Sequence, residues 1–221
     1  MEESPRHAHD VVKEFIDRDG VIRNGLSRGL VNVRALTRYI QVATREKYSF
    51  EALVSAIHRY PTKENADRYQ RVGGFIQKMA MKNGIVRVSV LNEPDIPIIL
   101  ARFSEKVDYG RGDTFHLATG IDTVNVLIDS KNREKLLAAL PKRSVQEVLG
   151  NLAQIIVLMS EEAIMTKGVA ATISTQLAVN DVNLRDLTWS MVQSAPHAII
   201  VVEEKDALKA YQAIEDLREK R

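Results

Sequence analysis

Apolar residues recur at helical spacing through the first 83 residues of the chain. Val33, Leu36 and Ile40 follow Asn32 at i, i+3 and i+7, and Asn32 can cap the free amides of that first turn. Ser49 caps the next segment in the same way, and Pro61 ends it. The pattern predicts a helical region with helices over residues 8–17, 21–26, 50–60 and 63–82 and a further helix from residue 33.

After Asn83 the apolar period changes from that of a helix to that of a strand. The pattern predicts strands at 85–91, 114–119 and 123–129, helices at 96–103 and 133–140, and a connector at 144–150. The same order then returns, with a strand at 154–159, a helix opened by Gly168, strands at 182–193 and 198–202, and a helix capped by Asp206. The chain therefore reads strand–helix–strand–strand–helix twice.

The two later parts can be laid on each other as an internal repeat. Residues 124–129 (VNVLID) match residues 198–203 (AIIVVE), and the following helices agree at Lys131/Lys205 and Lys135/Lys209. Two helices covering one face of a small antiparallel sheet give a ferredoxin-like layer, whose open face and edges favour pairing with a second unit. We expect an α+β chain: an all-α N-terminal domain (1–83), a βαββα unit with a connector (84–150) and a second βαββα unit (151–221).

Composition narrows the classes of protein. The chain has 221 residues, 45% of them hydrophobic, and no cysteine, which excludes disulfide scaffolds, thiolate zinc sites and cysteine nucleophiles and fits a reducing cytoplasm. The longest stretch without Asp, Glu, Lys or Arg, residues 187–202, is too short for a membrane-spanning helix. Gly25 to Gly29 match the G-x-S-x-G nucleophile motif but fall among helices, so we expect no catalytic serine, no enzyme activity, no cofactor and no metal.

Charge is divided unevenly along the chain. Residues 1–83 carry 15 Lys and Arg against 10 Asp and Glu, whereas residues 84–221 carry 16 against 19. A basic first part can be a solvated helical surface, a protein-docking domain or a nucleic-acid-binding segment. In the last case the helices that start at Asn32 and Ser49, with the short helix before them, would form a helix-turn-helix. The candidates for phosphate contact are Arg34, Arg38, Arg45, Lys47 and Arg59. The reader helix would then begin with Phe50, Glu51, Ala52 and Leu53, which is poor chemistry for base edges.

The third part, residues 152–217, resembles the ACT domain, a small-molecule-binding regulatory module of amino-acid metabolism. The resemblance lies in the segments MTKGVA (165–170), NDVN (180–183) and IIVVEEKDALKAY (199–211), which look like ACT domains of the aspartokinase type. Residues 84–141 look like a degenerate ACT unit, in which Pro94 to Pro97 replace the glycine that opens the first helix. The layout of the whole chain is similar to archaeal conserved proteins with a helical part before two ACT-like units.

The resemblance implies a ligand site at an interface between ACT units. The residues carried over by position are Met165, Thr166, Gly168, Val169, Asn180, Val182 and Asn183. A helix N-terminus suits a carboxylate, the asparagines suit polar ends of an amino acid, and Glu161 and Glu162 suit an ammonium group. Gly168 as a plain turn and Asn180 as a helix C-cap are equally good interpretations.

Two functions follow as hypotheses. The first is a non-enzymatic, cytoplasmic, homodimeric sensor of a small metabolite, most simply an amino acid. The second is a transcription regulator whose basic helices bind DNA and whose ACT-like units bind the effector.

Overall fold

The computed structural model describes residues 7–45, 47–61, 68–191 and 196–219, with the side chains of 68–70 and 219 left out. The chain divides into two compact units, Met1–Arg71 and Val72–Arg221. The α+β class expected from the sequence is confirmed, because helices and an antiparallel sheet are both present.

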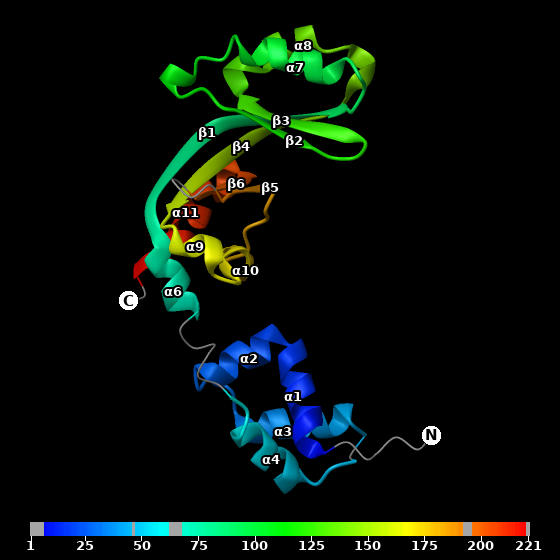
Figure 1. Cartoon of the computed structure of the whole chain (residues 1–221), viewed down its shortest axis with the longest axis vertical. Coiled ribbons are helices and arrows are strands. Elements are labelled where there is room, and N and C mark those ends of the chain that lie inside the picture. The colour runs from blue at the N-terminus through cyan, green and yellow to red at the C-terminus, as the bar shows by residue number, and fades with distance from the viewer. Residues whose placement is uncertain (1–6, 46, 62–67, 192–195, 220–221) are drawn as a thin grey trace. The chain divides into compact units, whose positions relative to one another are not determined.

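The first unit contains α1 (Ala8–Arg18), α2 (Gly20–Ser27), α3 (Val33–Ala43) and α4 (Phe50–His58) (Figure 1). The side chains of Asp19, Asn32 and Ser49 accept hydrogen bonds from backbone amides of the first turns of α2, α3 and α4, as the sequence predicted for the last two. The apolar faces of the helices meet in one core made of Val12, Ile16, Leu36, Ile40, Leu53, Ala56, Ile57 and Tyr60.

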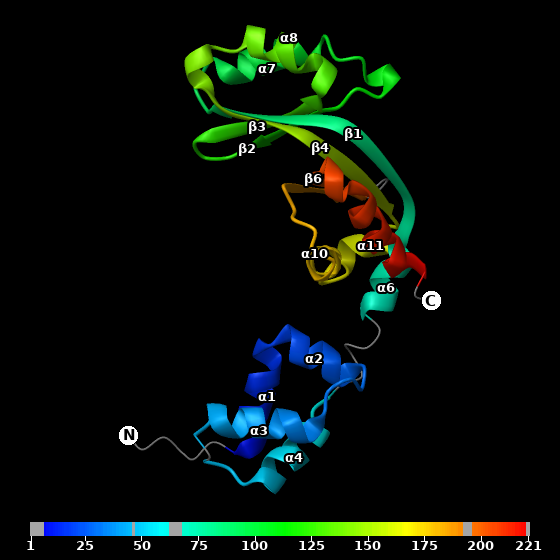
Figure 2. The same ribbon diagram turned by 180° about the vertical axis from the view of Figure 1, so that it is seen from behind.

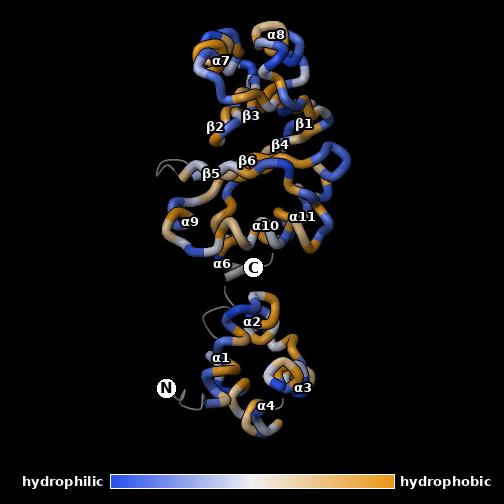
Figure 3. The backbone as a smooth tube through the Cα atoms, turned by 90° about the vertical axis from the view of Figure 1, so that its right-hand side faces the viewer, coloured by the Kyte–Doolittle hydropathy of each residue, from blue (hydrophilic) through white to orange (hydrophobic). Residues whose placement is uncertain are grey.

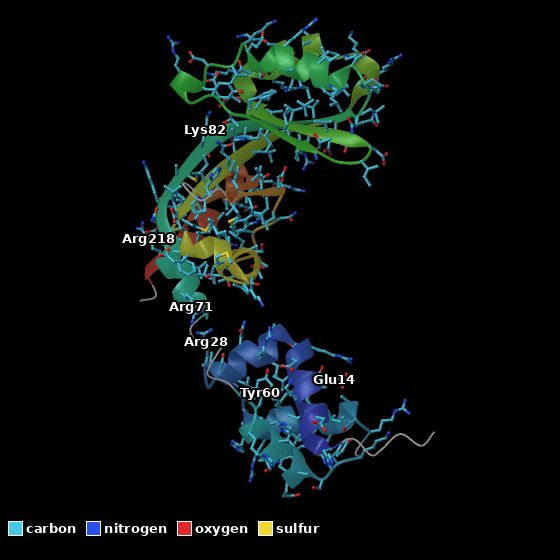
Figure 4. The ribbon with its side chains drawn as sticks, in the orientation of Figure 1. Glu14, Arg28, Tyr60, Arg71, Lys82 and Arg218 are labelled. Atoms are coloured by element: carbon cyan, nitrogen blue, oxygen red, sulfur yellow. The ribbon has the colours of Figure 1, made fainter. Side chains whose placement is uncertain are left out.

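Tyr60 ties the end of this helical unit to its start. Its hydroxyl donates to the Asp17 carboxylate at 2.6 Å, across 43 positions of the sequence (Tyr60 is labelled in Figure 4). Burial and the Asp17 charge raise the pKa of Tyr60 to about 12, and the same hydrogen bond lowers the pKa of Asp17. The contact therefore holds α1 against the residues that follow α4.

The second unit carries six strands and their covering helices. After α6 (Arg68–Phe75) it contains β1 (Ile76–Leu91), α7 (Ile96–Ser104), β2 (Phe115–Thr119), β3 (Thr123–Asp129), α8 (Arg133–Ala139) and β4 (Val145–Met159). Next come α9 (Glu162–Met165), α10 (Val169–Val179), β5 (Asp186–Ser190), β6 (His197–Glu203) and α11 (Ala207–Glu219), while short 3-10 turns η1 (Tyr109–Arg111), η2 (Ser130–Asn132), η3 (Lys142–Ser144) and η4 (Glu204–Asp206) join them.

Two expectations from the sequence are wrong here. The helix expected to reach residue 82 ends at Phe75, and the segment expected as a connector at 144–150 is the start of β4. Both segments carry charged side chains, Lys78 and Lys82 in the first and Glu147 in the second. Both are nevertheless strands, because residues 76–82 pair with residues 154–159 and residues 145–149 pair with residues 87–90 in one long antiparallel ladder. The pairing with distant strands therefore decides the secondary structure of these segments, against the preference suggested by their local sequence.

All six strands form one antiparallel sheet in the order β2-β3-β1-β4-β6-β5. The two long central strands, β1 and β4, are each used twice. Residues 85–90 of β1 pair with β3 on one side and with 145–152 of β4 on the other, whereas residues 76–82 of β1 pair with 154–159 of β4. Residues 152–158 of β4 in turn pair with β6.

This pairing divides the second unit into two halves that share strands. We name as the first half the segment 85–144 together with the start of β4, and as the second half the segment 152–219 together with residues 76–82 of β1. The first half contains helices α7 and α8, and the second half contains α9, α10 and α11. Each half has four strand segments in the order of a ferredoxin-like sheet, and the fourth segment comes from the long strand of the other half.

The halves stack in four layers (Figure 3). Helices α7 and α8 form one outer layer and α9, α10 and α11 the other, with the strands of the first and second halves between them. Seen from behind, α11 lies beside the long strands, as its contacts with β1 and β4 require (Figure 2). Because strand side chains alternate between faces, each half-sheet can pack on helices with one face and on the other half-sheet with the other.

Separate apolar clusters fill these layers. Val86, Val88, Val90, Val126 and Ile128 pack with α7 and α8, together with the other members of that core, Ile96, Leu100, Phe103, Val107, Val124, Leu136 and Leu140. The intervening positions of the same strands, Ile85 and Leu127, form a different cluster with Leu152, Ile199 and Val201. That second cluster lies where the two half-sheets face each other.

Polar contacts fix the bend at which β1 passes from one half to the other. Gly84 has a φ of 72° there, a value that glycine adopts without strain, and its amide donates to Glu204 Oε1 at 2.6 Å. Lys82 Nζ lies 2.5 Å from Asp129 Oδ1 and donates to the Gly112 carbonyl at 2.7 Å and to Thr114 Oγ1 at 3.1 Å. Lys82, labelled in Figure 4, thus joins the segment 76–82 to the first half.

Candidate functional site

The segment that joins β4 to α10 contains the first group of predicted site residues. It forms the single turn α9 and then opens α10 at Gly168, whose φ is 87°. This position has no side-chain cap. Because the first amides of a helix have no intrahelical acceptor, the backbone donors at the start of α10 remain available. Gly168 opens this helix as the sequence predicted.

The side chains beside Gly168 differ in what they offer. Met165 is 87% exposed, whereas Val169 is buried and anchors the first turn of α10 in the core. The Thr166 hydroxyl donates to the Glu162 carbonyl at 2.8 Å. Its donor is therefore used within the turn, and only the oxygen lone pairs of Thr166 are left for another molecule.

An open hollow of about 620 Å³ lies beside this turn. Its walls are Glu161, Glu162, Ile164, Met165 and Met191. The Ser160 hydroxyl and the Glu162 backbone amide lower the pKa of the Glu162 carboxyl, so this group stays charged to a lower pH than an ordinary glutamate. Sequence reasoning placed Glu161 and Glu162 beside the site but missed Ile164 and Met191, and no local signal links Met191 to a loop 26 residues earlier.

The second group of predicted residues lies at the other end of α10. Asn180 is the C-cap of that helix, and its side-chain amide donates to the Gln176 carbonyl at 2.8 Å. Val182 is buried and Asn183 is exposed. Since α10 has 11 residues and rises about 1.5 Å per residue, roughly 16 Å of helix separates the two groups. One copy of the chain does not bring the seven residues into a single site.

The corresponding segment of the first half is built differently. Helix α7 has Asp95 as N-cap and a proline in its first turn, Pro97. Proline has no amide hydrogen, so this helix start offers one donor fewer than α10. Ile96 beside it is buried in the core of the first half. The structure therefore places a glycine-opened helix in one half and a proline-opened helix in the other.

The basic residues predicted for nucleic acid lie on the first unit. Arg34 and Arg38 are exposed and one turn apart on α3, Arg45 and Lys47 lie between α3 and α4, and Arg59 follows α4. Arg59 Nε donates to the Ser55 carbonyl at 3.3 Å. Among the residues that the structure describes, no ion pair engages any of the five. Contact with DNA remains a prediction.

The described residues contain neither a metal site nor a membrane-spanning helix. No group of three or more His, Asp or Glu side chains there is placed to hold a metal ion. In the same part of the chain, every helix is too short or too polar to cross a membrane.

Comparison with solved structures identifies the fold. No family model and no curated protein matches the sequence. The chain is similar to the aspartate kinase of Clostridium acetobutylicum, with 23% identity and a TM-score of 0.55 over 65% of this chain and 35% of the enzyme. It is also similar to E. coli aspartokinase III in complex with aspartate and ADP, with 17% identity and a TM-score of 0.51 over 65% of this chain and 34% of the enzyme.

A third similarity concerns a regulatory protein alone. The regulatory subunit of aspartate kinase from Thermus flavus matches with 13% identity and a TM-score of 0.53, over 66% of this chain and 99% of the subunit. This chain thus spans about a third of the length of the kinases but nearly the whole of the regulatory subunit. The share of this chain that matches, about two thirds, equals the share that the second unit occupies. The chain therefore contains the ACT-type fold of the aspartate kinase regulatory domains.

Proposed function

We propose that this protein is a non-enzymatic regulator whose second unit senses a small metabolite, an amino acid. The observation that carries the proposal is the glycine-opened start of α10 beside the open hollow, within a fold shared with regulatory domains. Free helix amides can receive a carboxylate, and the adjacent glutamates can receive an ammonium group. In this proposal each half of the second unit is an ACT-like unit, and the second half holds the ligand.

Thermal unfolding against a panel of the twenty L-amino acids tests this function. A ligand present at about 100 times its Kd adds about 2.7 kcal/mol of stability, which raises the melting temperature measurably. The D-enantiomers are the matched controls, because they share charge and apolar area but not the arrangement around the α-carbon. If no amino acid shifts the transition at millimolar concentration, the proposed function is wrong.

We propose that the working form is a homodimer. Met165–Val169 and Asn180–Asn183 lie at opposite ends of α10 in one chain, and a two-fold axis would bring one copy's first group to the other copy's second group. Sedimentation equilibrium should therefore give twice the chain mass. A monomer at all concentrations, with an amino acid bound, would contradict the pairing.

A second candidate function is DNA binding by the first unit. It is favoured by the exposed pair Arg34 and Arg38 on one face of α3. Double substitution Arg34→Ala/Arg38→Ala should then weaken duplex binding and lower the steepness of its salt dependence, because two phosphate contacts are lost. The substitution Arg133→Ala, on α8, is the control. Absence of duplex binding at low salt, with and without amino acids, would exclude this function.

A further inference from the structure

The hollow beside α9 has walls of only two chemical kinds. Met165 and Met191 are 87% and 41% exposed, and Ile164 adds a third apolar wall. Glu161 and Glu162 supply the polar walls. The volume of about 620 Å³ lies within the range usual for sites of small ligands.

The carboxylates of Glu161 and Glu162 are not neutralised by ion pairs with side chains that the structure describes. In the part of the chain that the structure describes, no Lys or Arg side chain forms an ion pair with Glu161 or Glu162. A hollow along α1 is a contrast. Its walls are Asp10, Lys13, Glu14, Asp17 and Arg18, and within it Lys13 pairs with Asp17 at 3.1 Å and Arg18 pairs with Glu14. Negative charge beside α9 is therefore free to meet a cation from outside the chain.

The apolar walls of the hollow set a second requirement for its ligand, an apolar group. Methionine side chains are flexible and polarizable, so they adapt to apolar groups of various shapes. Large apolar side chains that gather at a hollow while exposed to water indicate a surface on which another apolar group is buried. An anionic side chain would meet two carboxylates and no cation in this hollow.

From this chemistry we propose that the hollow beside α9 binds an ammonium-bearing ligand with an apolar side chain, that is, an apolar α-amino acid such as leucine or methionine. The inference rests on the proposed function and narrows it to one class of amino acid. The ammonium group lies against Glu161 and Glu162, and the side chain lies against Met165, Met191 and Ile164.

Calorimetric titration of the full chain with L-leucine, L-methionine, L-lysine and L-aspartate tests the ligand class. An apolar amino acid should bind at least about tenfold more tightly than aspartate, because one methylene group in an apolar pocket is already worth about tenfold and the aspartate side chain would face Glu161 and Glu162. If lysine or aspartate binds and the apolar amino acids do not, this class is wrong while the proposed function stands. If none of these four binds, this class is wrong, and the panel of twenty L-amino acids decides whether the proposed function falls with it.

Substitutions locate the binding. Met165→Ser and Met191→Ser should each weaken leucine binding by about tenfold or more, and Glu161→Gln and Glu162→Gln should also weaken it. Leu208→Ser and Val179→Ser are matched controls, because these side chains are 72% and 69% exposed in the same half, and Glu105→Gln is the control for charge. Unchanged affinity in the Met165 and Met191 variants, with leucine bound, would place the ligand elsewhere and overturn the proposal.

Discussion

The two halves of the second unit have the same order of elements but start their first helices in different ways. Helix α7 of the first half begins at the buried Ile96 and has Pro97 in its first turn, whereas α10 of the second half has Gly168 as its N-cap, just after the short helix α9. Proline removes a donor, and glycine with positive φ leaves the first amides uncovered. The start of α7 is therefore packed into the core of the first half, whereas the start of α10 has no side-chain cap on its backbone amides.

The halves are nevertheless not independent. Each completes its sheet with a strand segment from the strand of the other, and Lys82 and Glu204 make contacts across the boundary. The loop before α10 follows β4 directly, and the start of β4 belongs to the first half. A ligand at that loop, as proposed, would therefore lie at the end of a strand that both halves share.

The largest expected effect comes from the two cores. Leu136→Ala in the first half and Ile173→Ala in the second remove fully buried side chains, and each should lower the free energy of unfolding by about 2–5 kcal/mol. Because the strands are shared, either substitution should shift one common unfolding transition of the second unit. Calorimetry that shows two transitions, with only one shifted by each variant, would show that the halves unfold separately.

Loss of the link at the bend should have a smaller effect. Lys82→Met removes the ion pair with the nearly buried Asp129 and leaves that carboxylate with one fewer partner. We expect a loss of about 1–3 kcal/mol in urea unfolding, the range for a hydrogen bond to a charged group. The control is Lys78→Met on the same strand. Equal stability of the two variants would mean that Lys82 does not join the halves.

A glycine in each half provides a matched pair. Gly168 has a φ of 87° and Gly112, in the first half, a φ of 77°. Alanine at either position should cost about 1–2 kcal/mol, because left-handed backbone is unfavourable for a residue with a Cβ. Only Gly168→Ala should also weaken the stabilisation by an amino acid in thermal unfolding. If Gly112→Ala weakens it equally, the site is not at α10.

The smallest effect concerns pH. Lys205 and Arg185 lower the pKa of Glu203 to about 2 from an ordinary value near 4.5. The stabilisation from this carboxylate is thus present above pH 4.5 and is lost as the pH falls toward 2. The difference in melting temperature between the wild type and Glu203→Gln should shrink as the pH is lowered from 6 to 3. A difference that is constant over this range would exclude the contribution.

Sequence reasoning succeeded where the signal is local. Asn32 and Ser49 cap their helices through their own side chains, and Gly168 opens α10, because capping and positive φ depend on one or two residues. It failed for 76–82 and 145–150, where Lys78 or Glu147 interrupts the apolar alternation and pairing across 55 or more positions decides the strand. The hollow likewise combines a local and a distant part. Glu161 and Met165 lie four positions apart in the sequence, whereas Met191 follows β5 and reaches the hollow only through the tertiary fold.

Mapping of backbone amide shifts by NMR tests most directly the claim that the second half binds and the first half does not. The full chain would be titrated with L-leucine, L-methionine, L-lysine and L-aspartate in turn. We predict that one of them shifts the amides of Met165, Gly168 and Val169 while those of Asp95 and Ile96 stay unchanged. Shifts confined to Asp95 and Ile96, or no shift with any of the four, would contradict the account.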